Sequence, residues 1–554
     1  MPASQSCDAR FPPRFLWADL RPLARALMLL LWAFAALGPA AAGDQSTPPG
    51  DQSPKPAEQG PKRMPLITVS KKTTALVSPL DAEGYVDYLA ALNQRVSQGV
   101  TPQNNAGVLL VRAWGAKEFE PRQRLQYFHV LGIEPLPDGG PFLTEFPAYV
   151  MKKMGRPATK TELADFDRAL HEAWSARRMP LISEWLKANA GPLDLVVAAT
   201  RRSQCYLPLV EPPGAGLQGM PLPGHDGSRK AARLMVARAM LRLGEGKIEE
   251  AEQDLLACHR LGRLYGRTPF AIPALVAVAI DSIAFQGDAE LLACGNLSAE
   301  RALAYQDALR KLPALPAMVD VIDRDERFVF LDTVASFARL GPPHGGGGGP
   351  RGGMLSGLLK GLSGGPALNW NDAFVFGNEQ FDKVVAAARK PTLAERKAAF
   401  AELDRETLAM SDKLKGGSDL GFLFTVMRKD MGRQIGMALT VLLLPAHQAY
   451  FEAESRSHAR EALEQVAFAL AAYRADHRAY PAGLNELAPK YLARLPLDPF
   501  SDQPLNYQKQ AAGFLLYSVG PNGVDDGGRT YDSKPRGDDI VFRVSPCAGP
   551  RTAR

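Results

Sequence analysis

The chain has 554 residues, of which 46% are hydrophobic and 22% are charged. This is the composition of a globular protein with a sizeable core, and at about 100–200 residues per domain the length predicts roughly three or four units. The formal net charge of +6 is small for this length and the basic residues are not clustered, which argues against a nucleic-acid partner.

The first 43 residues have the three parts of a secretory signal peptide. Four arginines precede an apolar run from Ala26 to Leu37, and small residues follow at 40–42. We therefore predict a signal peptide over residues 1–43 and export to the periplasm or cell envelope. The run is shorter than the ~20 residues of a membrane span, so membrane contact is expected only if the segment stays attached as a signal anchor. Residues 44–65, rich in Pro, Gly, Gln and Lys, are predicted to be a disordered linker.

Removal of the signal peptide leaves Cys205, Cys258, Cys294 and Cys547. In an oxidising compartment these could form two disulfides, with three possible connectivities. Cys258 and Cys294 lie in apolar helical stretches, which favours a role as small core residues for both.

Helical patterns dominate the middle of the chain. Residues 66–211 predict a mixed, mainly helical N-terminal domain, and residues 229–340 predict a helical hairpin or bundle domain. In the latter, apolar residues recur at spacings of three and four on both sides of Gly244-Glu245-Gly246, a break that fits the turn between two antiparallel helices. The hairpin resembles a tetratricopeptide unit, and a generic helical bundle is the alternative. The run from Pro273 to Leu292 is more apolar and predicts a buried helix.

Residues 341–366 are glycine-rich and predict a disordered linker, followed by a helical region over residues 367–454. A long amphipathic helix is then predicted from Ser455 to His477, ending before Tyr480-Pro481 because the residue before proline disfavours helix. Short strands are predicted at 505–508, 513–519 and 540–544, the last with alternating apolar residues.

Several short motifs occur in order within this C-terminal segment. After the helix come "YP", "LPxDPF", "PLxY", "GFxLYSVGxNGxDDGG" and "DDI". In this order they resemble the globular domain of the major type II secretion pseudopilin, over residues 455–544, with residues 545–554 as a tail. The resemblance implies one long helix packed on a small antiparallel sheet, with calcium in the last loop. The leader, peptidase site and N-terminal filament helix of that family do not precede the segment, so ordinary filament assembly is not expected.

The loop between the last two predicted strands is rich in oxygen ligands. Calcium takes six to eight such ligands from carboxylates, amide carbonyls and backbone, and the neighbouring glycines allow the backbone to fold around an ion. The resemblance contributes a serine to the ligand set, but it also places an asparagine where the family has an aspartate, which weakens the site. We predict a calcium site formed by Ser518, Asn522, Asp525, Asp526, Asp538 and Asp539. A solvated acidic turn without an ion is the alternative.

Motifs for catalysis are missing from the sequence. It contains no H-E-x-x-H, no Walker loop, and no G-x-G-x-x-G followed by a strand. Among the eight histidines only His447 and His458 lie near each other on one helical stretch, and each is expected to be an ordinary helix residue.

We therefore expect a mainly α-helical protein, bundle-like or repeat-like, with a C-terminal α+β domain. Its predicted function is that of a non-catalytic exported envelope protein whose helical region binds a protein partner or acts as a scaffold. Two alternatives stay open: a type II secretion component that docks on a pseudopilus, and a hydrolase within the helical region.

Overall fold

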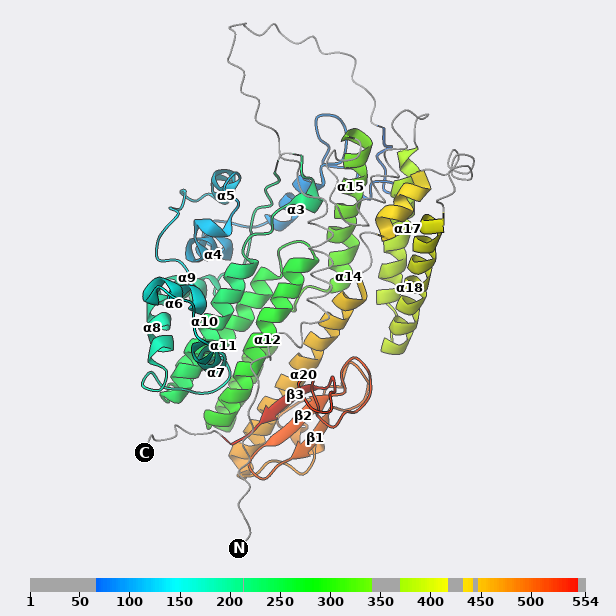
Figure 1. The fold of residues 1–554 in the computed structure, drawn as a ribbon. Coiled ribbons are helices and arrows are strands. Elements are labelled where there is room, and N and C mark those ends of the chain that lie inside the picture. Colours follow the sequence, from blue (N-terminus) through cyan, green and yellow to red (C-terminus); the bar gives the residue numbers. More distant parts are fainter. Residues whose placement is uncertain (1–65, 213, 341–368, 417–431, 442–446, 547–554) are drawn as a thin grey trace.

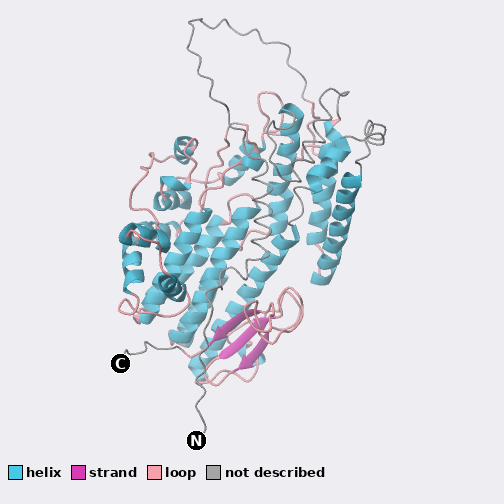
Figure 2. Ribbon diagram, viewed as in Figure 1, coloured by secondary structure: helices cyan, strands magenta, loops and turns pink. Residues whose placement is uncertain are grey.

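The computed structural model describes residues 66–212, 214–340, 369–416, 432–441 and 447–546. The predicted signal peptide, both predicted linkers and residues 547–554 lie outside the described residues. The described chain is mainly helical, with one small antiparallel sheet near its C-terminal end (Figures 1 and 2). The predicted fold class is therefore confirmed.

Short helices form the N-terminal part and pack along one side of the longer helices (Figure 1). Their starts follow local signals: Thr159 and Glu162 form a capping box, and prolines occupy the first turns of two others. Large aromatic side chains such as Trp174 and Trp185 fill the core between them. The helices are α3 (Tyr88–Val96), α4 (Ala106–Trp114), α5 (Arg124–Leu131), α6 (Phe146–Met154), α7 (Lys160–Ala169), α8 (Pro180–Ala188) and α9 (Ala190–Ala199).

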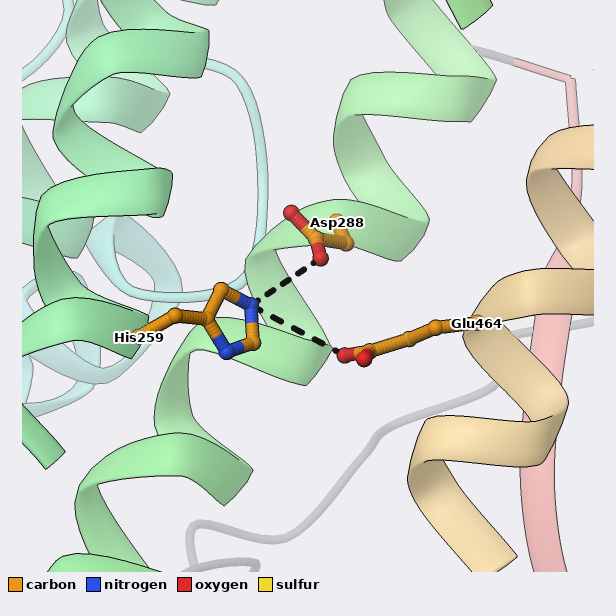
Figure 3. A group of neighbouring side chains, drawn as sticks. All are labelled: His259, Asp288 and Glu464. Carbon is orange, nitrogen blue, oxygen red and sulfur yellow. Dashed lines mark hydrogen bonds and ion pairs between the residues drawn. The ribbon is translucent and has the colours of Figure 1, made fainter. Parts of the chain in front are cut away.

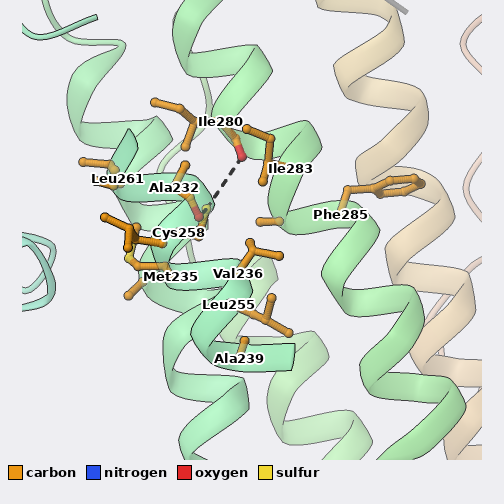
Figure 4. Close-up of a cluster of buried hydrophobic side chains, with 14 of the residues drawn as sticks. Ala232, Met235, Val236, Ala239, Leu255, Cys258, Leu261, Ile280, Ile283 and Phe285 are labelled. Carbon is orange, nitrogen blue, oxygen red and sulfur yellow. Dashed lines mark hydrogen bonds between the residues drawn. The ribbon is translucent and has the colours of Figure 1, made fainter. Parts of the chain in front are cut away.

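Four long helices follow: α10 (His225–Gly244), α11 (Ile248–Tyr265), α12 (Ala271–Cys294) and α13 (Ala299–Arg310). α10 and α11 form the predicted hairpin, and side chains such as Val236, Leu255 and Ile283 interlock between α10, α11 and α12 (Figure 4). The last residue of α10, Gly244, must be glycine because a Cβ there would lie 1.9 Å from the backbone oxygen of Trp174.

α12 is the predicted buried helix, and its burial is confirmed. By length and composition alone it could cross a membrane, but 78% of its most apolar window is buried in protein. Its first turn is capped by carboxylates rather than by its own N-cap side chain: Asp325 accepts from the Phe270 amide at 3.2 Å and Glu326 from the Ala271 amide at 2.8 Å. Both come from a π-helical turn, Val321–Glu326, and place carboxyl oxygens at the positive end of the helix dipole.

The cysteines divide into two kinds. Cys205 and Cys258 are buried free thiols, as expected for a core residue at Cys258. Cys294, at the end of α12, is disulfide-bonded. The core-residue prediction is therefore wrong for Cys294, because the helix ends there and its side chain is only partly buried.

A second apolar core lies beyond α13. It contains α14 (Met318–Asp320), α15 (Arg327–Leu340), α17 (Trp370–Ala388), α18 (Leu393–Gly416) and the helical residues 432–441. Tyr450 and Phe451 join this core from the first turns of α20 (His447–His477), which begins upstream of its predicted start at Ser455. One continuous helix thus crosses the predicted boundary at residue 455.

The C-terminal sheet contains β1 (Asn506–Lys509), β2 (Phe514–Ser518) and β3 (Ile540–Val544), in the order β1-β2-β3. All pairings are antiparallel, and Leu516 lies opposite both Tyr507 and Phe542. The sheet contacts α20, as the resemblance implied, and it also contacts α12. Phe542 meets Phe285 of α12 edge-on, with ring centroids 5.1 Å apart. The sheet therefore shares one apolar core with α4–α13 and α20. We call the helices together the helical body.

Candidate metal centres

The acidic loop joins β2 to β3. It brings together Asp526, Asp538 and Asp539, whose potential ligand oxygens all lie within 4.8 Å of one another. Gly520 makes this approach possible: its φ is +69°, and a Cβ there would lie 2.2 Å from the Asp538 carbonyl oxygen. Glycine is thus needed both for backbone conformation and for space.

Backbone amides orient the three carboxylates. Asp539 accepts from the Gly528 amide at 2.7 Å, and Asp526 accepts from the Asp538 amide at 3.2 Å. Asp526 is also paired with Arg529 at 3.1 Å. The Oδ1 atom of Asp538 is buried and has no hydrogen-bond partner among the described residues. A buried carboxylate oxygen without a partner carries a desolvation cost that a cation would offset.

The acidities of these groups reflect their surroundings. Burial raises the pKa of Asp539 to about 6 and also raises the pKa of Asp538. The pKa of Asp526 is lowered, chiefly by the hydrogen bond from Asn522. Asp526 and Asp539 are therefore carboxylates near neutral pH, the form that binds hard cations.

The other predicted ligands have different contacts. The Asn522 side chain donates to Asp526 at 3.1 Å, while its oxygen accepts from the Val524 amide at 2.5 Å. Asp525 accepts from the Tyr517 hydroxyl at 3.0 Å. Asn522 thus borders the group of carboxylates, and Asp525 turns toward the sheet.

Ser518 is also engaged elsewhere, since its hydroxyl donates to Asp498 Oδ1 at 2.8 Å. Asp498 is fully buried and also accepts from the amides of Phe500 and Val519, each at 2.9 Å. It fastens the "LPLDPF" turn to the end of β2. Its function was not predicted, and the only sequence signal is an aspartate in an otherwise apolar, proline-containing turn.

A second group of polar side chains is buried between three helices. His259 of α11, Asp288 of α12 and Glu464 of α20 point toward one another (Figure 3). His259 Nε2 lies 3.1 Å from Asp288 Oδ2 and 3.8 Å from Glu464 Oε1. The potential ligand atoms of the three residues all lie within 4.8 Å of one another, and all three residues are buried. We call these residues the core triad.

An outer layer of polar groups holds the core triad in place. His259 Nδ1 donates to Asp281 Oδ1 at 2.7 Å, and Asp281 is ion-paired with Arg263. The Tyr305 hydroxyl donates to Asp288 Oδ1 at 2.7 Å. Glu464 Oε1 is buried and receives no hydrogen bond from the described residues.

Burial and charge act in opposite directions on these groups. Burial alone would lower the pKa of His259, but the nearby carboxylates of Asp281 and Glu464 raise it overall. Burial raises the pKa of Asp288 and, more strongly, that of Glu464. The core triad therefore contains more negative charge than the surrounding protein readily accommodates.

The core triad was not predicted from the sequence. Of the two histidines that lie near each other in the sequence, His458 is exposed on α20 and the side chain of His447 lies outside the described residues. The three residues of the triad are far apart in the chain, and the one available signal was the presence of Asp281 and Asp288 within the apolar run of α12. Comparison with protein-family models, with curated proteins and with solved structures finds no match for this chain.

Proposed function

We propose that this protein is a non-catalytic, exported component of the cell envelope, with a helical body that binds a protein partner and a C-terminal sheet stabilised by calcium. The observation that carries the calcium proposal is the convergence of Asp526, Asp538 and Asp539, with Asp538 Oδ1 buried and unpaired among the described residues. The disulfide at Cys294 supports export, because disulfides persist in oxidising compartments.

The three carboxylates have a mechanical role in this proposal. Asp538 and Asp539 lie immediately before β3, and Asp526 lies in the middle of the loop. Calcium, when bound, supplies the positive charge that allows these carboxylates to lie together. Their backbone hydrogen bonds then fix the loop against the sheet, which shares its core with the helical body.

Thermal melting of the full chain with calcium and with a calcium chelator tests this site. A cation that binds only the folded state stabilises it by about 2.7 kcal/mol at a free concentration a hundred times its Kd. We expect calcium to raise Tm in the wild type and also in Asp525→Asn, because the wild-type Asp525 carboxylate contacts Tyr517 and not the other three carboxylates. Asp538→Asn should abolish the rise. Equal melting of the wild type with and without calcium would leave the loop as a solvated acidic turn.

The partner-binding part rests on a basic cavity in the helical body. The cavity has a volume of about 600 Å³ and lies between the residues after α9, α11 and α13. Arg260 of α11 has no hydrogen bond or ion pair among the described residues, and burial lowers its pKa. An acidic segment of a partner protein would complement this charge. The basic residues that line the cavity are Arg202, Arg260, Arg263, Arg267 and Lys311, with Asp307 as its one acidic residue.

Binding of a fluorescent polyglutamate peptide tests the cavity. We expect affinity that falls with added salt and that drops at least tenfold in Arg260→Glu, because a free cation in the cavity becomes an anion. Lys160→Glu, at the exposed start of α7, should bind as the wild type does. Equal loss in both variants would indicate non-specific attraction to the net charge.

Docking on a pseudopilus is the second candidate, favoured by the ordered C-terminal motifs that resemble the pseudopilin domain. This candidate predicts that purified pseudopilin subunits bind the full chain and that Arg260→Glu leaves the binding unchanged. Failure of these subunits to bind at micromolar concentration would remove it.

A further inference from the structure

We propose that the core triad of His259, Asp288 and Glu464 binds a divalent transition-metal ion of the zinc class, which fastens α11, α12 and α20 together inside the helical body. The contributing helices are separate in sequence, and their ligands point inward (Figure 3). Metal sites in helical bundles are built in this way, from side chains on facing helices.

The spacing of the ligand atoms suits such an ion. Bonds of about 2.0–2.1 Å in a tetrahedral site place neighbouring ligand atoms about 3.3 Å apart. His259 Nε2 lies 3.1 Å from the Asp288 oxygen and 3.8 Å from the Glu464 oxygen. Small side-chain adjustments would therefore bring all three atoms to bonding distance, without movement of the helices.

The balance of charge supports the same conclusion. Arg263 compensates Asp281, which leaves two buried carboxylates, those of Asp288 and Glu464, around one imidazole. Glu464 Oε1 has no hydrogen-bond partner among the described residues. Burial of an unpaired carboxylate is costly. A divalent cation with a neutral histidine would balance the charges of the Asp288 and Glu464 carboxylates.

The outer contacts prepare His259 as a ligand. Its Nδ1 donates to Asp281 at 2.7 Å, so in the neutral imidazole Nε2 would carry the lone pair, on the side of Asp288 and Glu464. A carboxylate behind a metal-bound histidine is the usual arrangement and raises the basicity of the ligand. Tyr305 orients Asp288 in the same way through its other oxygen. One imidazole with two carboxylates favours zinc or a similar first-row ion over calcium or magnesium, which prefer oxygen ligands alone.

The full chain, purified without chelator from zinc-supplemented medium, provides the test through metal analysis and thermal melting. We expect about one equivalent of a transition metal in the wild type and a Tm that rises by several degrees with zinc. Glu464→Gln should lose both the metal and the rise in Tm. Glu461→Gln is the matched control, because Glu461 lies on the same helix but pairs with Arg263. It should retain both.

Two results would overturn the proposal. Absence of metal and of any zinc effect on the wild type, with Glu464→Gln at least as stable, would mean that Glu464 is a protonated acid, because glutamine has the same shape as the neutral carboxyl group. Metal retained in Glu464→Gln but lost in Asp538→Asn would place the ion in the acidic loop instead. Because Asp538→Asn leaves the core triad intact, failure of the calcium proposal and failure of this one are distinguishable.

Discussion

Replacement of Phe542 by alanine tests whether the C-terminal sheet and the helical body unfold as one unit. Phe542 is fully buried in β3, where its ring lies 5.1 Å from Phe285 of α12 and 6.4 Å from Phe514 of β2. Truncation of a buried phenylalanine to alanine costs about 3–5 kcal/mol through lost burial and the cavity that remains. Because the ring contacts both units, we expect the cost to affect both.

Hydrogen exchange of the full chain, followed by mass spectrometry, measures this cost separately in each element. Amides that exchange only through global opening should exchange roughly two to four orders of magnitude faster in Phe542→Ala, in peptides from both β3 and α12. Leu497→Ala is the control within the same region, since Leu497 is exposed and its loss should change little. A double-mutant cycle with Phe285→Ala should give a coupling energy of about 0.5–1.5 kcal/mol.

Faster exchange confined to the sheet would refute this reasoning. If α12 kept its protection in Phe542→Ala, the sheet would open as an independent unit and the shared aromatic contact would carry no coupling. A coupling energy of zero between Phe285 and Phe542 would lead to the same conclusion.

Three further predictions concern the helical body. Burial raises the pKa of Glu326 from 4.5 to about 7, so its neutral form stabilises the fold fully below about pH 4.5 and this stability is lost as pH rises through 7. Glu326→Gln should therefore match the wild type at pH 4 and exceed it by at most about 3 kcal/mol at pH 8, and parallel Tm curves would contradict this. Asp254→Ala leaves Arg238 and Arg242 without their buried partner. It should lower the free energy of unfolding in urea by about 3–5 kcal/mol, and a decrease below about 1 kcal/mol would mean that the pairing contributes little. Gly244→Ala should cost about 3 kcal/mol in the same assay through its clash with Trp174, and Gly191→Ala, which meets open space, should cost nothing.

Local signals account for much of the fold. The turn after Gly244, the end of the long helix before Tyr480 and the positions of all three strands follow from apolar spacing, glycine and proline, which act over a few residues. The start of α20 was placed too late, at Ser455 instead of His447. The first turns of this helix take their stability from packing against a second core, and a local pattern does not show that contact.

The acidic loop was predicted as a metal site, but only some of its predicted ligands lie together. The sequence does not distinguish one carboxylate of a short loop from another. The direction in which each carboxylate points depends on the backbone amides and hydroxyls that it contacts. Tyr517 draws Asp525 toward the sheet and Asp498 engages Ser518, whereas Asp538 and its neighbours remain together.

By itself, the sequence determined that the chain is mainly helical, where the turn after α10 and the end of α20 lie, and which loop gathers acidic groups, because these depend on residues close together in the chain. Only the tertiary structure decided that His259, Asp288 and Glu464 meet. Their contact depends on how α11, α12 and α20 cross, and that crossing is set by the fit of apolar side chains over the whole shared core. A polar residue on an apolar helix needs a polar partner, but which partner it contacts depends on how the helices pack.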